Sequence, residues 1–285
     1  MIFFISDGRL GNQIFQYSFL KTLAKTNEKI IALRMNHFLS IFNVNNKNFK
    51  APIFSRYALF FMIKILVPFF IFLSKVKLIS IIEQTYLYGM PAEGYLKKRG
   101  LFPFTFVKTG FFQSEKMFKK ESIDFSLKDN DLLKAKYILQ EIGQYDFVFV
   151  HVRRGDYLNE TFNGQRGINL PKKYFSKAMH EFSDKLENIY YIFLTDDFDY
   201  VDCCFNEIKN KYISKESMAV DLALMSSCKY GITSNSSFSW WGAYLMPERI
   251  KVIFPKYWYG WKTKKESNPG IHPSWATILQ IEDID

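Results

Sequence analysis

The sequence predicts an α/β fold built on parallel β-sheets, and two observations support this. In the second half of the chain, short buried apolar runs alternate with helical patterns, which is typical of a parallel sheet. In the first half, an apolar strand at 2–5 meets a glycine turn and then a helical pattern. The length of 285 residues allows one large domain or two of ordinary size.

The second half shows the alternation most clearly. Its predicted strands are 146–152, 189–195, 229–233 and 251–254, and its predicted helices are 171–186, 216–227 and 236–245. Pro171 stands in the first turn of the first of these helices, where a missing N–H group costs nothing. Ligands of parallel sheets bind at the carboxyl ends of the strands, and the polar motifs of this chain fall at those ends.

The first half is less regular. The sequence predicts a strand at 2–5, a helix at 12–26, strands at 30–34 and 108–112, and a helical start at 114–115. Mixed helical patterns and loops are expected between residues 36 and 105, because four prolines interrupt this stretch. A charged helix at 126–141, followed by Gly143, is the linker candidate. We therefore expect an N-terminal domain at 1–140 and a C-terminal domain at 141–285.

Composition narrows the class of partner. Apolar residues make up 48% of the chain and charged residues 23%, and 38 basic against 28 acidic residues give a net charge of +10. Such a charge favours an anionic partner: a nucleic acid, a membrane surface or a phosphorylated small molecule. No nucleic-acid recognition motif occurs, which disfavours the first. Three cysteines without a CxxC pair exclude a zinc site built from them and favour a reducing compartment.

The segment 57–82 is rich in large apolar residues. Lys64, Pro68 and Lys75 interrupt it, and the run 65–74 between the lysines is shorter than the roughly 20 residues of a membrane-spanning helix. We expect a buried or inter-domain helical segment here. A peripheral membrane contact, with snorkelling lysines and apolar side chains in the interface, is the second interpretation, and a true span is the third.

The first polar motif, 7–13 (DGRLGNQ), follows the opening strand. Gly8 and Gly11 permit a tight turn and close approach of a ligand, and the N–H groups of a helix start favour negative charge. The spacing matches neither GxGxxG nor a Walker A loop, which argues against a nicotinamide or kinase site. An ordinary strand-to-helix turn is the alternative.

The second motif, 151–157 (HVRRGDY), ends the strand 146–152. Strand alternation places His151 and Arg153 on one side and Arg154 on the other. Charged groups at a buried strand end are costly unless paired or bound to ligand. We expect one arginine to bind phosphate, which suits the guanidinium fork, while its neighbour makes a structural ion pair. A salt-bridge cluster alone is the alternative.

Two further motifs follow later strands. The motif 233–242 (TSNSSFSWWG) places hydroxyls and an amide at a helix N-terminus, where they can donate to one anion or simply cap the helix. The motif 195–199 (TDDFD) contains an Asp-x-Asp pair that suits a divalent cation with a sugar-nucleotide diphosphate. One of these carboxylates can instead accept from a guanine edge or a ribose hydroxyl, or cap a helix.

Together these motifs resemble the bacterial α-1,2-fucosyltransferases of glycosyltransferase family 11. GRLGNQIFQY resembles the opening motif of the family, GFFQSEKMF its mid-chain motif, and HVRRGDY the arginine motif shared with α-1,6- and protein O-fucosyltransferases. FLTDD, DLALMSSCKYGITSNSSFSWWGAYL and the tail from FPKYWYGW through HPSWATI follow in family order. The resemblance runs from about residue 4 to residue 278.

The resemblance implies a GT-B fold, in which two Rossmann-like parallel-sheet domains face each other across a cleft. The domain 1–140 would lie on the acceptor side, and the domain 141–285 would bind GDP-fucose. The implied reaction is inverting transfer of L-fucose from GDP-fucose to the 2-hydroxyl of a galactose-type acceptor in a surface or lipid-linked oligosaccharide. No metal and no other cofactor is implied.

The resemblance also suggests roles for individual residues. Arg153 resembles the arginine that holds the diphosphate, and Ser236 and Ser237 resemble the phosphate-binding hydroxyls. The expected catalytic residues are Arg153, Asp156 and Asn12, and the expected GDP-fucose-binding residues are His151, Arg153, Arg154, Gly11, Asn12, Asp196, Asn235, Ser236 and Ser237. Asp196 is expected at the nucleoside, and Asn12 near the diphosphate and the acceptor. Asp156 and Asp7 are both candidates for the general base.

The sequence departs from the family pattern in two places. Many relatives carry Thr-His-Gly where this chain has Gln165, Arg166 and Gly167, and the segment 36–105 matches poorly, so the acceptor does not follow from the resemblance. Two alternatives remain: a metal-dependent GT-A transferase using Asp197 and Asp199, and a nucleotide-sugar or glycan-binding protein without turnover. The expected location is the bacterial cytoplasm, with peripheral contact at the inner membrane.

Overall fold

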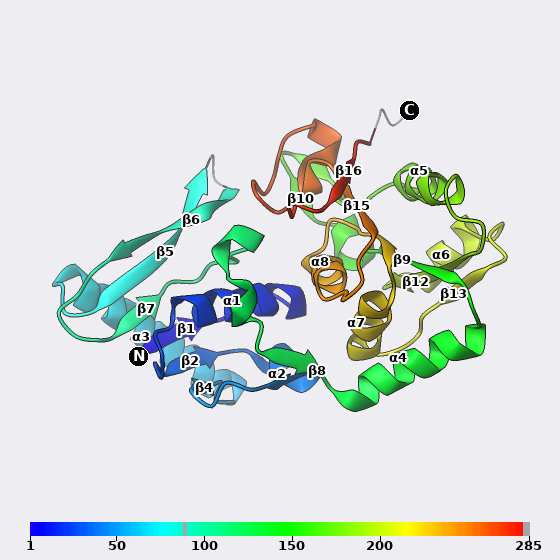
Figure 1. The fold of residues 1–285 in the computed structure, drawn as a ribbon. Helices are drawn as coiled ribbons and strands as arrows, with labels where there is room; N and C mark the ends of the chain where they lie inside the picture. The colour runs from blue at the N-terminus through cyan, green and yellow to red at the C-terminus, as the bar shows by residue number, and fades with distance from the viewer. Residues whose placement is uncertain (88–89, 282–285) are drawn as a thin grey trace. The chain divides into compact units, whose positions relative to one another are not determined.

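The computed structural model describes residues 1–87 and 90–281, and the chain divides into two compact units (Figure 1). Unit 1 comprises Met1–Ser126 with Pro269–Ile271, and unit 2 comprises Leu127–Asn268 with His272–Asp285. Each unit contains its own six-stranded, largely parallel sheet. The predicted α/β class is therefore confirmed.

The boundary between the units lies ahead of the charged helix rather than behind it. The sequence predicted domains at 1–140 and 141–285, whereas the units divide after Ser126. The helix, α4 (Asp129–Ile142), packs against α7 (Met218–Ser227) of unit 2. The partner of α4 lies far along the sequence, and so the charge pattern of the helix does not reveal to which unit it belongs.

The large sheet of unit 2 is wholly parallel and has a Rossmann-like order, β13-β12-β9-β14-β15-β16. Its strands are β9 (Asp146–Val152), β12 (Ile189–Thr195), β13 (Lys211–Ile213), β14 (Tyr230–Ile232), β15 (Lys251–Pro255) and β16 (Thr277–Leu279). The chain builds outward from β9 to β13 and then adds β14 on the other side of β9. The strand order therefore reverses between β9 and β14, and ligands of such sheets bind at this switch point.

Helices and short turns complete unit 2. They are α4, α5 (Lys172–Ser183), α6 (Phe198–Cys204), α7, α8 (Ser237–Tyr244) and the 3-10 turns η3 (Gly155–Leu158) and η4 (Trp258–Thr263), together with the hairpin β10 (Thr161–Phe162) and β11 (Gln165–Arg166). Val150 and Phe193 of the sheet share a buried core with Phe175 of α5. The predicted strands 146–152 and 189–195 coincide with β9 and β12.

The sheet of unit 1 has the order β4-β2-β1-β7-β5-β6, and only the edge pair β5–β6 is antiparallel. Its strands are β1 (Ile2–Ile5), β2 (Ile30–Leu33), β4 (Phe49–Lys50), β5 (Ser80–Leu87), β6 (Met90–Lys98) and β7 (Thr105–Val107). The remaining elements of the N-terminal region are α1 (Leu10–Leu23), α2 (Asn36–Ile41), α3 (Arg56–Lys75), η1 (Glu115–Met117), η2 (Lys120–Ser122) and the pair β3 (Phe42–Val44) and β8 (Phe125–Leu127).

The predicted strand at 108–112 is wrong, because the strand of this region is β7, which pairs with β1 and β5. The N–H groups of Phe111 and Phe112 donate to the side-chain oxygen of Gln84, at 2.9 and 3.2 Å. Phe112 also has a left-handed φ of 52°, which ends extended structure. A side chain from a distant strand thus takes the place of a sheet partner.

The helical segment expected within 57–82 is present, but the prediction that it is buried is wrong. α3 is a continuous helix from Arg56 to Lys75 that passes through Pro68, and none of its residues is buried. Its length and apolar composition suffice for a membrane span. The hairpin β5–β6 follows it as a long two-stranded ribbon (Figure 1), where the sequence predicted only helical patterns and loops.

Candidate functional site

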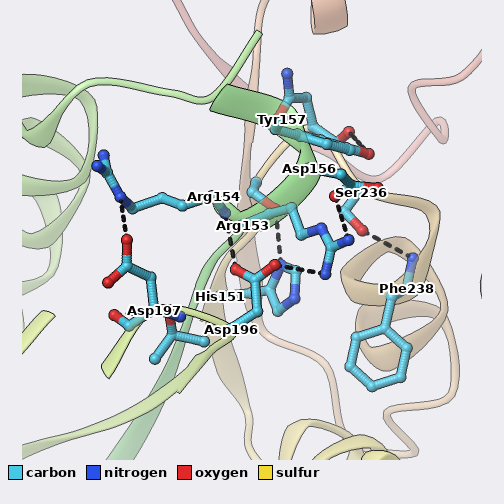
Figure 2. Close-up of polar contacts among 12 residues, drawn as sticks. His151, Arg153, Arg154, Asp156, Tyr157, Asp196, Asp197, Ser236 and Phe238 are labelled. Carbon is cyan, nitrogen blue, oxygen red and sulfur yellow. Dashed lines mark hydrogen bonds and ion pairs between the residues drawn. The ribbon is translucent and has the colours of Figure 1, made fainter. Parts of the chain in front are cut away.

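The predicted residues of unit 2 gather at the carboxyl ends of three neighbouring strands (Figure 2). Arg153 and Arg154 directly follow β9, Asp196 follows β12, and Ser236 comes shortly after β14. β9 pairs in parallel with both other strands, so the three ends meet at one edge of the sheet. This edge includes the switch point between β9 and β14.

Arg153 is held between two carboxylates. Its Nη1 lies 2.7 Å from Oδ2 of Asp196, and its other terminal nitrogen pairs with Asp156 in the following turn. The guanidinium lies 5.3 Å from the ring centroid of Tyr157, and its side chain is 18% exposed. The arginine is therefore fixed in orientation while still reachable from solvent, and fixing it beforehand lowers the entropy cost of binding an anion.

Arg154 has different partners, as strand alternation predicted. Its Nε donates to Oδ2 of Asp197 at 2.8 Å, and its guanidinium lies 3.5 Å from the ring centroid of Tyr200. Its backbone N–H donates to Oδ1 of Asp196 at 2.8 Å. Arg154 thus forms an ion pair with Asp197, separate from the two carboxylates that hold Arg153.

His151 is buried beside Ser234. Its Nδ1 lies 2.7 Å from the hydroxyl oxygen of Ser234, its ring lies 5.6 Å from that of Phe238, and only 6% of it is exposed. Burial, and secondarily the charge of Arg153, lower the pKa of His151 to about 3. The imidazole is therefore neutral near pH 7, so it adds no positive charge to the predicted GDP-fucose site.

The N-terminus of α8 lies at the same sheet edge. Ser236 caps the helix, its hydroxyl accepting from the N–H of Phe238 at 3.3 Å, and Ser237 begins the helix half-buried. Figure 2 shows the cap drawn with the Arg153 cluster. The hydroxyl of Tyr157 donates to the backbone carbonyl of Asn235 at 3.3 Å and links the two motifs. Hydroxyls and helix N–H groups at this end suit an anion.

The side-chain amide of Asn235 donates hydrogen bonds to backbone carbonyl groups. It is fully buried, and its Nδ2 donates to the carbonyl oxygens of Ile168, at 2.7 Å, and Trp258, at 3.4 Å. The amide thus connects the segments that contain Ile168 and Trp258. Donor binding by Asn235 stays a prediction.

The charges of the cluster do not balance. Two guanidinium groups face the three carboxylates of Asp156, Asp196 and Asp197. An anionic ligand at Arg153 must compete with a carboxylate already there. Asp156 is the more exposed of the two partners, at 37% against 27% for Asp196, and it lies on the short turn η3. Asp156 is therefore the more accessible of the two carboxylates that hold Arg153.

Gly155 makes room for this cluster. A Cβ atom at this position would lie 2.4 Å from Oδ2 of Asp196, the oxygen that pairs with Arg153. No side chain fits at that distance unless the carboxylate moves. The glycine of the arginine motif is thus required by a close approach between the ends of β9 and β12.

Gly11 and Asn12 belong to unit 1, whereas the other predicted site residues belong to unit 2. They lie in the first turn of α1, after Gly8, whose φ is 82°. Oδ1 of Asn12 accepts from Nε2 of Gln113 at 2.6 Å, so the opening and mid-chain motifs meet here. A Cβ atom at Gly8 would lie 2.2 Å from Nδ2 of Asn12, which explains a glycine in this turn.

Asp197 of the Asp-x-Asp pair is engaged by groups of unit 2. Oδ1 of Asp197 accepts from the N–H of Tyr200 at 3.2 Å, capping α6, and Oδ2 accepts from Arg154. Asp199 lies exposed in the first turn of the helix. Within residues 1–87 and 90–281, no group of three or more His, Cys, Asp and Glu side chains is placed to hold a metal ion.

Several residues of the site were not predicted. They are Tyr157 beside Arg153, Ser234 beside His151, Tyr200 beside Arg154 and Gln113 beside Asn12. Tyr157 stands within the arginine motif, so its position in the sequence was a signal that it lies near Arg153. The others come from separate strands or loops, and only the sheet order brings them to their partners.

Comparison with known proteins identifies the family. The family described as Glycosyl transferase family 11 matches residues 2–279. An α-1,2-colitosyltransferase of Escherichia coli is 31% identical over 159 residues, which are 53% of this chain and 55% of that protein. The O-antigen biosynthesis glycosyltransferase WbnK of Escherichia coli is 31% identical over 142 residues, 48% of this chain and 46% of that protein.

A mammalian relative matches over a longer region. Galactoside α-(1,2)-fucosyltransferase 1 of Oryctolagus cuniculus is 27% identical over 258 residues, 84% of this chain and 62% of that protein. The matched regions thus span about half the length of the two bacterial relatives and less than two thirds of the rabbit enzyme.

Two solved fucosyltransferases of GT-B type, NodZ and POFUT1, have a similar fold. NodZ α-1,6-fucosyltransferase co-crystallised with GDP has a TM-score of 0.52 and 13% identity, covering 86% of this chain and 92% of that one; NodZ is from Bradyrhizobium. POFUT1 in complex with GDP has a TM-score of 0.50 and 12% identity, covering 89% and 97%. With the family match over nearly its whole length, the chain is a member of glycosyltransferase family 11 with a GT-B type α/β fold.

Proposed function

We propose that the protein transfers L-fucose from GDP-fucose, with inversion and without a metal, to the 2-hydroxyl of a galactose-type acceptor in a surface oligosaccharide. The names of its relatives support transfer to a 2-hydroxyl and a role in O-antigen synthesis. The observation that carries the proposal is the fixed guanidinium of Arg153 at the switch point of unit 2, where the N-terminus of α8 also lies.

The site is suited to stabilise a leaving diphosphate. The acceptor oxygen attacks the anomeric carbon, the bond from that carbon to the diphosphate oxygen breaks, and negative charge grows on GDP. Arg153 donates to this charge as a fork, and the hydroxyls of Ser236 and Ser237 and the N–H groups of α8 assist. Donors fixed before the reaction stabilise the transition state most.

Asp156 is suited to accept the proton of the acceptor hydroxyl. It pairs with Arg153 when no anion is bound, and a diphosphate at Arg153 would release it. The released carboxylate stays on η3, in the turn that follows Arg153. Asp7, whose Oδ1 accepts from the N–H of Gly8 at 2.9 Å, is the other candidate base, on the loop of unit 1.

Asp196 and Asn12 hold other groups in place in this proposal. Both oxygens of Asp196 accept within the cluster, one from Arg153 and one from the backbone of Arg154, which suits an orienting role. Contact with the nucleoside remains a prediction for this residue. Asn12, held by Gln113, is proposed to contact the diphosphate and the acceptor.

A donor screen tests the proposal. The chain is incubated with a galactosyl acceptor and GDP-fucose, GDP-colitose, GDP-mannose or UDP-galactose, with and without EDTA, and the product linkage is determined by NMR. We expect α-1,2-fucosyl product in the presence of EDTA. Preference for GDP-colitose would assign the sugar of the bacterial relative instead. Loss of turnover in EDTA would refute metal independence, and GDP binding without turnover would favour a binding protein.

The proposed location is the bacterial cytoplasm. The cysteines Cys203, Cys204 and Cys228 are free thiols, which suits a reducing compartment. GDP-sugars made inside the cell would then reach the site directly.

A further inference from the structure

One side of α3 exposes several large apolar side chains to solvent. We define the outer face as Tyr57, Phe60, Phe61, Ile65, Phe69 and Phe72, whose exposed fractions lie between 51% and 80%. Their spacing of mostly three or four residues puts them on one side of the helix. Soluble proteins expose large apolar side chains singly, so a continuous stripe of this kind indicates an interaction surface.

The inner side of α3 is already occupied. Side chains including Leu59, Ile63, Leu66 and Phe70 pack on the core of unit 1, and the rings of Phe3 and Phe70 are 5.1 Å apart. A helix whose one side is packed on its own sheet does not present apolar side chains to lipid all round, as a span requires. α3 therefore has the length of a span but the packing of a surface helix.

The outer face continues onto the loop after β6. The N–H of Leu101 donates to the carbonyl of Lys77, and that of Phe102 to the carbonyl of Leu78, each at 2.9 Å. The side chains of Leu101 and Phe102 are 77% and 55% exposed. The loop is thus fastened just beyond the C-terminal end of α3 and adds two apolar side chains to the same region.

Basic side chains accompany this surface. The exposed cations on α3 and the adjoining loops are Arg56, Lys64, Lys75, Lys77 and Arg99. The chain carries no acidic residue between Glu28 and Glu83. The Nζ of Lys64 lies over the ring of Phe60, 4.4 Å from its centroid, so a cation lies beside the aromatic side chains of the outer face. Long basic side chains take this arrangement at a membrane interface.

We propose that the outer face of α3 docks on an anionic phospholipid bilayer, with the helix lying in the plane of the interface. The aromatic side chains enter the headgroup boundary, and the cations contact anionic headgroups. A second copy of the chain fits this surface less well, because identical cations would face one another. The proposal concerns where the protein resides, and it does not depend on its donor or acceptor.

Vesicle flotation of the full chain tests the proposal. The protein is mixed with phosphatidylcholine vesicles, or with vesicles in which phosphatidylglycerol replaces one third of the lipid. We expect flotation with the anionic vesicles, and a partition coefficient about tenfold lower with the neutral ones or at high salt. Failure of the protein to float with anionic vesicles would overturn the proposal, whatever sugar the enzyme transfers.

Two sets of variants locate the contact. The triple variant Phe61→Ser, Phe69→Ser and Phe72→Ser removes apolar side chains, and Lys64→Glu, Lys75→Glu and Lys77→Glu reverses charges. Each set is expected to weaken partition by about tenfold or more. The apolar control is Leu133→Ser with Tyr137→Ser, which are 63% and 61% exposed on α4. The charge control is Lys136→Glu, Lys185→Glu and Lys209→Glu in unit 2.

Circular dichroism checks that the variants fold. If the phenylalanine variant does not fold, the charge-reversal variant still tests the proposal. Equal binding by wild type and both α3 sets would place the contact elsewhere and overturn the proposal. Sedimentation of the wild type as a dimer that the phenylalanine variant dissociates, without vesicle binding, would make a second copy the occupant. Resistance of the cellular protein to alkaline carbonate extraction would show a span instead.

Discussion

At the scale of single residues, the decisive feature is how Arg153 is held. A free arginine side chain has many rotamers, and ordering it on binding costs free energy. Here Asp196 and the ring of Tyr157 hold the guanidinium before any ligand arrives. Ordering of the guanidinium therefore takes place on folding, before an anion competes with its carboxylate partners.

Replacing Arg153 by lysine should nearly abolish transfer. Lysine keeps the charge but loses the fork that spans two acceptors, so we expect turnover to fall on the order of 10²–10³-fold. The measurement is kcat with GDP-fucose, and the control is Arg56→Lys, an exposed arginine on α3. Near-wild-type turnover of a folded Arg153→Lys protein would contradict the role assigned to this residue.

Replacing Asp156 by asparagine should separate binding from turnover. The competing carboxylate at Arg153 is removed, so the Kd for GDP should fall by several-fold. The proton acceptor is removed too, so kcat should fall by about 10²-fold. Calorimetric titration with GDP and steady-state kinetics measure the two effects. Asp199→Asn, an exposed carboxylate on α6, is the control, and a large loss of activity in it would revive the metal-dependent alternative.

His151 should make the protein sensitive to acid. Its folded-state pKa of about 3 lies below its unfolded value, so the unfolded state binds more protons between these values. The free energy of unfolding therefore rises with pH up to about 6.5, the pKa of an unperturbed histidine, and decreases as the pH falls below that value. His151→Asn, which retains a partner for Ser234, should reduce the difference in unfolding free energy between pH 7 and pH 5 by about 2 kcal/mol.

Tryptophan fluorescence is a suitable probe for this measurement, because all five tryptophans belong to unit 2. Equal pH dependence of wild type and His151→Asn would show that the imidazole titrates normally and is not shielded as described.

At the scale of elements, the parallel strand order of unit 2 brings the site residues together. β9 lies between β12 and β14, so residues that follow three separate strands meet at one edge. The positions of the side chains then depend on close approach of the backbone, as at Gly155. A small displacement of one strand end is therefore transmitted to the guanidinium of Arg153.

Gly155→Ala should lower activity while leaving the fold largely intact. The new methyl group would push away the carboxylate of Asp196, which is the mobile end of a side chain, rather than the backbone. Misplacing Arg153 through its partner should cost about 10²-fold in kcat. Asp196→Asn should reproduce this loss if the carboxylate is the link, and a fully active Gly155→Ala protein would contradict it. Fluorescence-detected melting checks the fold of both.

At the scale of the whole molecule, the chain consists of two units with separate sheets, and the residues predicted for the donor site come from both. Unit 2 holds Arg153 and the N-terminus of α8, and unit 1 holds Asn12. The membrane-docking face proposed above belongs to unit 1. Donor chemistry and lipid contact are thus features of different parts of the chain.

GDP should protect unit 2 from hydrogen exchange at the strand ends. A ligand that binds only the folded state suppresses opening of the elements it contacts. We expect slower exchange at residues 153–158 and 234–238, measured by mass spectrometry with and without GDP. Protection at 8–13 as well would support a diphosphate contact by the loop of unit 1. Absence of protection at 153–158 would contradict a nucleotide site at Arg153.

The sequence by itself determined the α/β class, the strands β9 and β12, and the motifs that identify the family. These depend on local patterns: apolar runs, glycine spacing and charged residues at strand ends, all of which are readable along one stretch of chain. The tertiary structure alone decided which carboxylate pairs with which arginine, that Asn235 is directed to the backbone, that α4 belongs to unit 2, and that α3 is exposed. Each of these depends on a partner from a distant part of the chain, and sheet order and packing choose that partner.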